Sequence, residues 1–325
     1  MTRLIFVVAS VLLIGWAGLW VVSSWSLKRD IESWFDDRRA EGWQAEYTDL
    51  SVRGFPSRLD TTLTGVRLQD AARGVGWDAP FFQILGLTYR PGHLILVWPE
   101  TQTLTLSSGP VRIASTGLRA SLIHGAEGQI LRANLEAGAL TIGGPQGALA
   151  FDGLRAAVTS IPGAPDLYRI GLTTDTLATP DDTPVPGNAK ADGLQLQAEV
   201  RFDQDWTLDA LSGPRPQPQQ IDLRKADYRL EGLELILAGQ LTADARGRAS
   251  GKVTVHAVNA RNTLDHARDA QQLPKGLIDT LETALSLASG LKGTSNTLDL
   301  SLDFTEGRVS FGLIPLGEAP RLRLP

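Results

Sequence analysis

The spacing of hydrophobic positions divides the chain into a short helical part and a long part made of strands. Residues 4–22 are continuously apolar, and the residues after them, up to Glu41, place apolar side chains at helical spacing. After Trp43 the spacing becomes two, the period of a strand with one apolar and one wet face. We therefore expect a mainly β protein: an N-terminal transmembrane helix followed by extended antiparallel β-sheets, arranged as a curved sheet or a sandwich.

The regular strands define a candidate apolar surface. Apolar and polar residues alternate without a break from Leu194 to Phe202, and Leu233–Leu241 repeats the pattern. Asp244–Gly247 and Thr305–Arg308 contain glycine and have the length of hairpin turns. The apolar face of these strands is either a groove for an acyl chain or a closed core. The candidate groove consists of Leu194, Leu196, Val200, Phe202, Leu233, Leu235 and Leu237.

The apolar N-terminal segment predicts a membrane anchor. As a helix, Leu4 to Val22 would extend about 28 Å, close to the ~30 Å hydrocarbon core of a bilayer. Trp16, Trp20 and Trp25 lie near its end, as amphipathic rings do at a membrane interface. Signal peptides have apolar cores of about 7–15 residues, so we favour an uncleaved signal anchor over a cleaved signal.

The anchor implies a location for the rest of the chain. Long segments cross a membrane largely regardless of charge. We therefore expect a single-pass protein of the bacterial inner membrane, with its main domain in the periplasm.

The same patterns suggest how the chain is organised. Residues 1–25 form the anchor, and residues 26–42 form an amphipathic helix that either lies on the bilayer or covers the end of the next domain. We favour the second arrangement, because the charges on its polar face are mixed in sign. Proline-rich residues near 178–190 separate two β-rich halves, 43–178 and 190–325, of which the second contains a short helical insertion near 262–290.

Composition removes several classes of function. The chain has 0 cysteines and a net charge of −5. It therefore has no thiolate chemistry and lacks the basic footprint of a nucleic-acid-binding protein. Gly74–Ala79 fits a dinucleotide-binding pattern, but Pro80 stands where the helix should open. No histidine has the spacing of a metal pair. We expect no enzymatic activity and no catalytic, cofactor or metal site.

Five short strings together resemble a known family. Behind a single N-terminal span, their order is similar to that of the uncharacterised bacterial family called domain of unknown function 2125, which implies no particular activity. Four polar residues within them lie at predicted strand ends and are candidate contacts for an anionic lipid headgroup: Tyr89, Arg90, His93 and Arg119. The strings are Gly54-Phe55-Pro56, Trp77-Asp78-Ala79-Pro80, Tyr89-Arg90-Pro91-Gly92-His93, Val97-Trp98-Pro99 and Arg119-Ala120-Ser121.

A second resemblance covers the C-terminal half. Leu233–Leu241, Asp244–Gly247 and Ser250–Val255 resemble the hairpins of AsmA-like envelope proteins, which are membrane-tethered and implicated in lipid handling. Our hypothesis is a membrane-anchored periplasmic protein that binds lipid or helps to transfer it. The alternative is a scaffold or assembly factor that acts through protein contacts in the envelope. The expected partners are thus the inner membrane, lipids and other envelope proteins.

Overall fold

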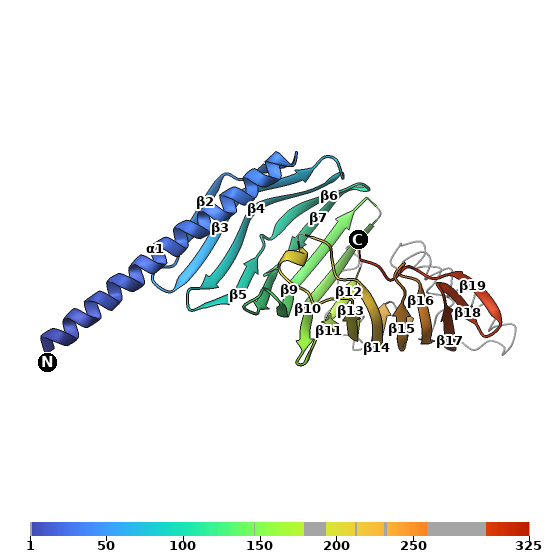
Figure 1. Cartoon of the computed structure of the whole chain (residues 1–325). Coiled ribbons are helices and arrows are strands. Elements are labelled where there is room, and N and C mark those ends of the chain that lie inside the picture. Colours follow the sequence, from blue (N-terminus) through green and yellow to red (C-terminus); the bar gives the residue numbers. More distant parts are fainter. Residues whose placement is uncertain are drawn as a thin grey trace. The chain divides into compact units, whose positions relative to one another are not determined.

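The protein is mainly β, with one long N-terminal apolar helix followed by antiparallel sheet (Figure 1). The structure is a computed structural model that describes residues 2–145, 147–178, 193–211, 213–230, 233–258 and 297–324. The chain forms two compact units, residues 1–123 and 124–325. The proposed helical insertion near 262–290 lies outside the described residues.

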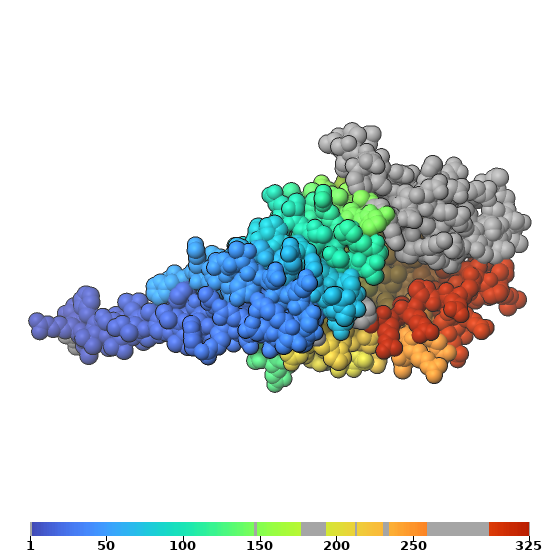
Figure 2. All heavy atoms as spheres, turned by 90° about the horizontal axis from the view of Figure 1, so that it is seen from above, coloured from blue at the N-terminus to red at the C-terminus, as the bar shows by residue number. Residues whose placement is uncertain are grey.

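A single helix joins the apolar segment to the first unit. Helix α1 (Thr2–Ala40) is continuous, and its beginning stands clear of the sheet (Figures 1 and 2). Near its end, Phe35 is 3% exposed and packs with Leu50, Leu63 and Val66 of the sheet. The segment that sequence analysis separated as an amphipathic helix is therefore the last part of α1, and its apolar side contacts the sheet.

The first sheet is a meander in which several strands are interrupted. All its pairings are antiparallel: β1 and β2 with β3, β3 with β4, β4 with β5 and β6, β6 with β7, and β5 with β8. The strands are β1 (Gln44–Glu46), β2 (Asp49–Arg53), β3 (Arg58–Asp70), β4 (Val75–Leu87), β5 (Arg90–Val97), β6 (Thr101–Leu106), β7 (Gly109–Ser115) and β8 (Arg119–His124).

The interruptions form a line across the sheet. Gly65 of β3 lies opposite Pro80 of β4, and the breaks between β1 and β2, β5 and β6, and β7 and β8 fall at the same level. At this line the alternation of faces changes phase, because Leu63 and Val66, three residues apart, both enter the core. A positive φ of 59° at Gly65 permits the change. We call this line the bend of the first sheet.

The second unit is a longer meander. Successive strands pair antiparallel from β9 to β19, except that β12 pairs with β10 while β11 pairs with β13. The expected hairpin turns after Ala243 and Thr305 are present. The strands are β9 (Ile130–Gly144), β10 (Gly147–Ile161), β11 (Ala164–Thr173), β12 (Thr176–Ala178), β13 (Gly193–Phe202), β14 (Pro218–Leu230), β15 (Leu233–Ala243), β16 (Ala249–Val258), β17 (Thr297–Thr305), β18 (Arg308–Phe311) and β19 (Ile314–Glu318).

The division into units does not follow the proline-rich stretch. The expected boundary near 178–190 falls within the second unit, because β11 and β13 pair on either side of it, from Leu167 opposite Arg201 to Thr173 opposite Gln195. Proline excludes a segment from the interior of a sheet, but this exclusion does not by itself mark a boundary between domains. The units instead meet in sequence at Ile123 and His124.

Tyr168 is at the centre of one core of the second unit. It is 1% exposed and packs with Ala198, Val200 and Phe202. Its hydroxyl oxygen accepts a hydrogen bond from the backbone N–H of Trp206 at 3.0 Å. Burial raises the pKa of the Tyr168 phenol above its ordinary value.

The C-terminal tail crosses the turns at one end of the second sheet. The backbone N–H groups of Ala319 and Leu322 donate to the carbonyls of Gly307 and Gly247, each at 2.8 Å. Farther along, the Leu324 N–H donates to the side chain of Gln217 at 2.9 Å. The tail thereby connects two hairpin turns to the segment that precedes β14.

We predict that Gly65→Ala destabilises the first unit more than Gly74→Ala does. Both glycines have positive φ, so each change costs about 1–2 kcal/mol of backbone strain. Only at Gly65 would the new Cβ also lie 2.3 Å from the hydroxyl oxygen of Thr48, whereas Gly74 has open space. Chemical unfolding measures the difference in stability between the two variants. Adding Thr48→Ala to the Gly65→Ala variant should recover part of the lost stability, because it removes the hydroxyl that the new Cβ approaches. Equal losses for the two alanine variants would contradict the close approach.

We predict that Tyr168→Phe lowers the free energy of unfolding of the second unit by about 1–3 kcal/mol. The change removes only the hydroxyl and leaves the partly buried Trp206 N–H without this partner. Chemical unfolding followed by fluorescence measures the loss. Tyr89→Phe, at a side chain that is 60% exposed, is the control and should have little effect.

Candidate functional site

The candidate site is the end of the first unit that lies beside the apolar part of α1. The indole N–H of Trp16 donates to the carbonyl of Pro56 at 2.8 Å, and that of Trp20 donates to the carbonyl of Arg58 at 2.6 Å. Trp20 also meets Phe55 edge to face, with ring centroids 5.5 Å apart. Two of the three tryptophans expected at the membrane interface therefore hold the turn between β2 and β3.

The helical repeat explains why Trp25 behaves differently. Positions 16 and 20 are one turn apart and share a helix face. Trp25 points elsewhere: it is 60% exposed, and the guanidinium of Arg29 lies 3.9 Å from its ring centroid.

The turn between β2 and β3 depends on a glycine. Gly54 has φ of 108°, and a Cβ there would lie 2.6 Å from the Cβ of Arg58. The Arg58 N–H donates to the Gly54 carbonyl at 2.8 Å and closes the turn. Gly54 therefore allows Phe55 and Pro56 to reach the helix.

The helix before this contact is exposed. The large apolar side chains from Leu4 to Ile14 are 50–72% exposed. By length and composition, α1 can cross a membrane. Such a helix serves as a signal or as a membrane anchor.

Sequence analysis expected four polar residues to meet a headgroup, and the structure does not gather all of them. Tyr89 and Arg90 lie at the turn between β4 and β5, at the same end as the Gly54 turn. His93 follows on β5 and is half-buried opposite Ile123. Arg119 lies opposite Val97, near the other end of β5. Tyr89 and Arg90 therefore belong to the candidate site, and Arg119 is remote from it.

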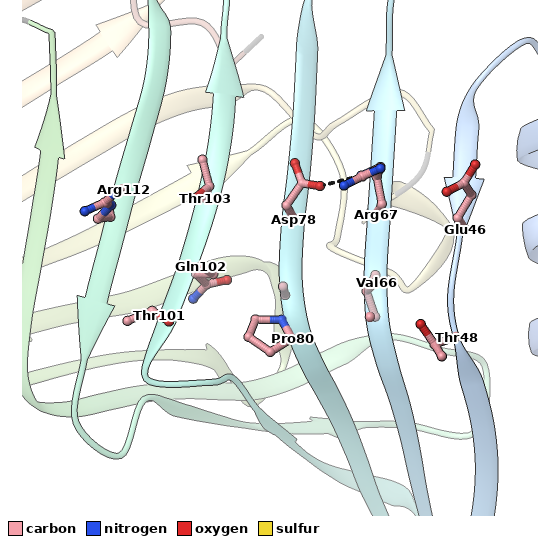
Figure 3. Close-up of a pocket in the computed structure, with 12 residues that line it drawn as sticks. Glu46, Thr48, Val66, Arg67, Asp78, Pro80, Thr101, Gln102, Thr103 and Arg112 are labelled. Carbon is pink, nitrogen blue, oxygen red and sulfur yellow. Dashed lines mark hydrogen bonds and ion pairs between the residues drawn. The ribbon is translucent and has the colours of Figure 1, made fainter.

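A polar hollow of about 770 Å³ lies at the bend of the first sheet (Figure 3). Strand register places five of its side chains in one row across five strands. The Nε of Arg67 donates to Asp78 at 2.8 Å, and this hydrogen bond raises the pKa of Arg67. The row is Glu46, Arg67, Asp78, Thr103 and Arg112.

The hollow has little preference for charged ligands. Its two carboxylates and two guanidiniums cancel in net charge, and exposed ion pairs of this kind contribute little to stability. Sequence reasoning missed the row because its members come from five separate strands. Only the pairing register brings them together.

A second polar row crosses the other sheet. Arg169 pairs with Glu199 at 3.2 Å, and Lys252 pairs with Asp303 at 3.3 Å. Asp222 and Gln240 lie between these pairs in the register. These residues form the polar, solvent-facing side of the sheet that the alternating pattern predicts.

The candidate apolar groove lies on the opposite face. Leu194 and Leu235 flank Tyr228 in the register, and Leu196 and Leu237 flank Ala226, so all four share one face. Leu194, Leu196 and Leu237 are half-buried, and the side chain of Leu233 lies outside those that the structure describes. Val200 and Phe202 are 7% exposed and Leu235 is 2% exposed.

Part of this face is a core in the structure. Val200 and Phe202 pack with Trp206 of the following loop and with Leu324 of the C-terminal tail. Leu237 packs against a second core that contains Leu235, whereas Leu194 and Leu196 belong to neither of these two cores.

The structure also shows where the candidate metal ligands and the glycine motif lie. Among the described residues, no three His, Cys, Asp or Glu side chains gather as metal ligands. His256 pairs with Asp299 at 2.6 Å on an exposed surface, and His266 lies outside the described residues. The glycines at Gly74 and Gly76 lead into strand β4, not into a helix.

We predict that Trp16→Phe combined with Trp20→Phe loosens the β2–β3 turn. Phenylalanine keeps an aromatic ring but removes both indole N–H donors, each worth about 0.5–1.5 kcal/mol. Hydrogen exchange of the Arg58 amide in detergent micelles measures the change and should become faster. Trp25→Phe is the matched control, and equal protection in both variants would contradict the role of the indoles.

Comparison with known proteins places the chain in a family. A family model described as an uncharacterized protein conserved in bacteria (DUF2125) matches residues 20–320. No curated protein and no solved structure matches the chain. The resemblance of the C-terminal half to AsmA-like proteins therefore has no support from these comparisons. Because the family match covers most of the chain, the protein belongs to the bacterial family DUF2125.

Proposed function

We propose that the protein is a single-pass inner-membrane protein whose β body lies in the periplasm, where it binds lipid and helps to transfer it without an enzymatic step. The observation that carries this proposal is the continuity of α1. The helix runs without a break from its exposed apolar beginning to Phe35 in the core of the first unit. An anchor built in this way keeps the first unit at the membrane surface instead of on a flexible tether.

The apolar face of the second sheet supports binding of an acyl chain. Leu194, Leu196 and Leu237 are half-buried on this face, and each would lose exposed surface to a bound chain. Complete burial of an exposed leucine contributes about 1.5–3 kcal/mol. The partial burial of a few such residues is enough for a bound lipid.

We predict that the full-length protein carries lipid that depends on this face. Protein extracted gently from a Gram-negative envelope should contain enriched, stoichiometric lipid by mass spectrometry. Leu196→Asp combined with Leu237→Asp should remove it, because charge at half-buried positions repels an acyl chain. Circular dichroism must show that this variant is still folded, since Leu237 packs against the core that contains Leu235. The matched control is Gln197→Asp combined with Gln240→Asp, on the exposed polar face of the same two strands.

The outcome also decides between two functions. Lipid content equal to that of an unrelated single-span protein would contradict the lipid-binding proposal. It would favour the second candidate, a scaffold or assembly factor in the envelope, which the burial of Val200, Phe202 and Leu235 supports because these residues form a filled core. Crosslinking of the full-length protein to envelope proteins then tests the scaffold.

A further inference from the structure

Two turns of the first unit lie together beside the anchor. The carbonyl of Ser57, in the β2–β3 turn, accepts hydrogen bonds from both the backbone N–H and the hydroxyl of Thr88, in the β4–β5 turn, at 3.0 and 3.1 Å. The first turn is in turn held by Trp16 and Trp20. These contacts hold the β2–β3 turn against α1 and the β4–β5 turn against the β2–β3 turn. The N-terminal part of α1 projects beyond the sheet (Figure 1).

Each turn presents an exposed aromatic ring. Phe55 is 58% exposed although its edge meets Trp20, and Tyr89 is 60% exposed. The two hydrogen-bonded turns thus present exposed aromatic rings at the same end of the first unit. Aromatic rings at the end of a unit that adjoins an anchor are typical of the membrane interface.

The length of the helix determines the depth of these turns. From Leu4 to Gly15, before the first contact with the sheet, α1 is about 18 Å long. The hydrocarbon core is ~30 Å thick. Residues 4–15 are too short to span that core, so the helix leaves it no earlier than Trp16, and the turns held by Trp16 and Trp20 lie against the bilayer instead of clear of it. Thinning the bilayer by the difference would cost free energy for every ångström of mismatch.

The charge of this end suits lipid phosphates. Arg53 and Arg90 flank the two turns and are exposed, and neither forms an ion pair with a residue that the structure describes. Arg58 is paired with Asp60 at 2.9 Å. Unpaired guanidiniums beside exposed rings combine the two features of an interfacial anchor, since guanidinium groups bind phosphate oxygens well.

We propose that the turns Gly54–Ser57 and Thr88–Arg90 form a membrane-contact surface in which Phe55 and Tyr89 enter the interfacial layer of the bilayer that holds α1, and Arg53 and Arg90 bind its headgroup phosphates. This proposal rests on the anchoring part of the proposed function. It adds a second attachment to the same bilayer. With two attachments, the first sheet has a fixed tilt as well as a fixed height.

Depth-dependent fluorescence quenching tests the contact. The chain has 0 cysteines, so single-cysteine variants of the full chain can be labelled without background. Phe55→Cys and Tyr89→Cys report on the turns, Val11→Cys on the anchor, and Ser108→Cys on the β6–β7 turn at the far end of the sheet. Tyr89 has no described packing partner, so its replacement spares the fold. The labelled proteins are reconstituted in phosphatidylethanolamine–phosphatidylglycerol vesicles that carry a spin label at the headgroup or along the acyl chain.

We expect the headgroup spin label to quench positions 55 and 89 several-fold more strongly than position 108, and the acyl-chain label to quench position 11. Quenching at 11 together with 55 and 89 equal to 108 would overturn the membrane-contact surface and leave the anchor intact. No quenching at 11 would instead refute the anchor itself.

The two arginines are tested in the same assay. Arg53→Gln combined with Arg90→Gln should weaken the quenching at position 89. Unchanged quenching would show that the rings hold the surface without the phosphates, and it would overturn that part of the proposal.

Discussion

The attachment of α1 to the first sheet is the contact on which the architecture of this unit depends. Phe35 enters the core at one end of the contact, and the indoles of Trp16 and Trp20 bind backbone carbonyls of a turn at the other. A long apolar helix by itself gives only a tether. Contact with the sheet makes the helix part of the first unit, so the position of the helix also fixes the position of the strands beside it.

The bend of the first sheet follows from a second constraint, the limited backbone choices at a few positions. Gly65 takes a left-handed conformation, and Pro80, which lies opposite, cannot donate a hydrogen bond. Breaks in the neighbouring strands align with this pair, because each strand must follow the one it pairs with. The bend also creates the polar hollow, where register places Arg67 against Asp78.

The second unit shows how closely a β-meander follows its sequence pattern. Strict alternation in β13 and β15 separates an apolar face from a face crossed by ion pairs. The C-terminal tail adds contacts that alternation does not encode, since it runs across turns made by Gly247 and Gly307 and ends beside Gln217. Such a tail holds together hairpins that are far apart along the chain.

The sequence by itself determined the elements whose signals are local. Continuous apolarity predicted the long helix, alternation predicted antiparallel strands, and short glycine-bearing segments predicted the turns after Ala243 and Thr305. These succeed because period, propensity and turn chemistry act over a few neighbouring residues. The compact units divide at Ile123 and His124 and not near the proline-rich stretch, because proline signals exclusion from a sheet and carries no information on which strands pair.

Only the tertiary structure decided which distant residues meet. It joined the turn that carries Tyr89 to the turn that carries Phe55, but left Arg119 near the other end of β5. It assembled the polar row from Glu46 to Arg112, which no local sequence pattern predicts. It also buried Val200 and Phe202 against Trp206 and Leu324. The physical reason is that a strand's own pattern sets which face is apolar, whereas pairing register and the paths of loops and tail set what that face touches.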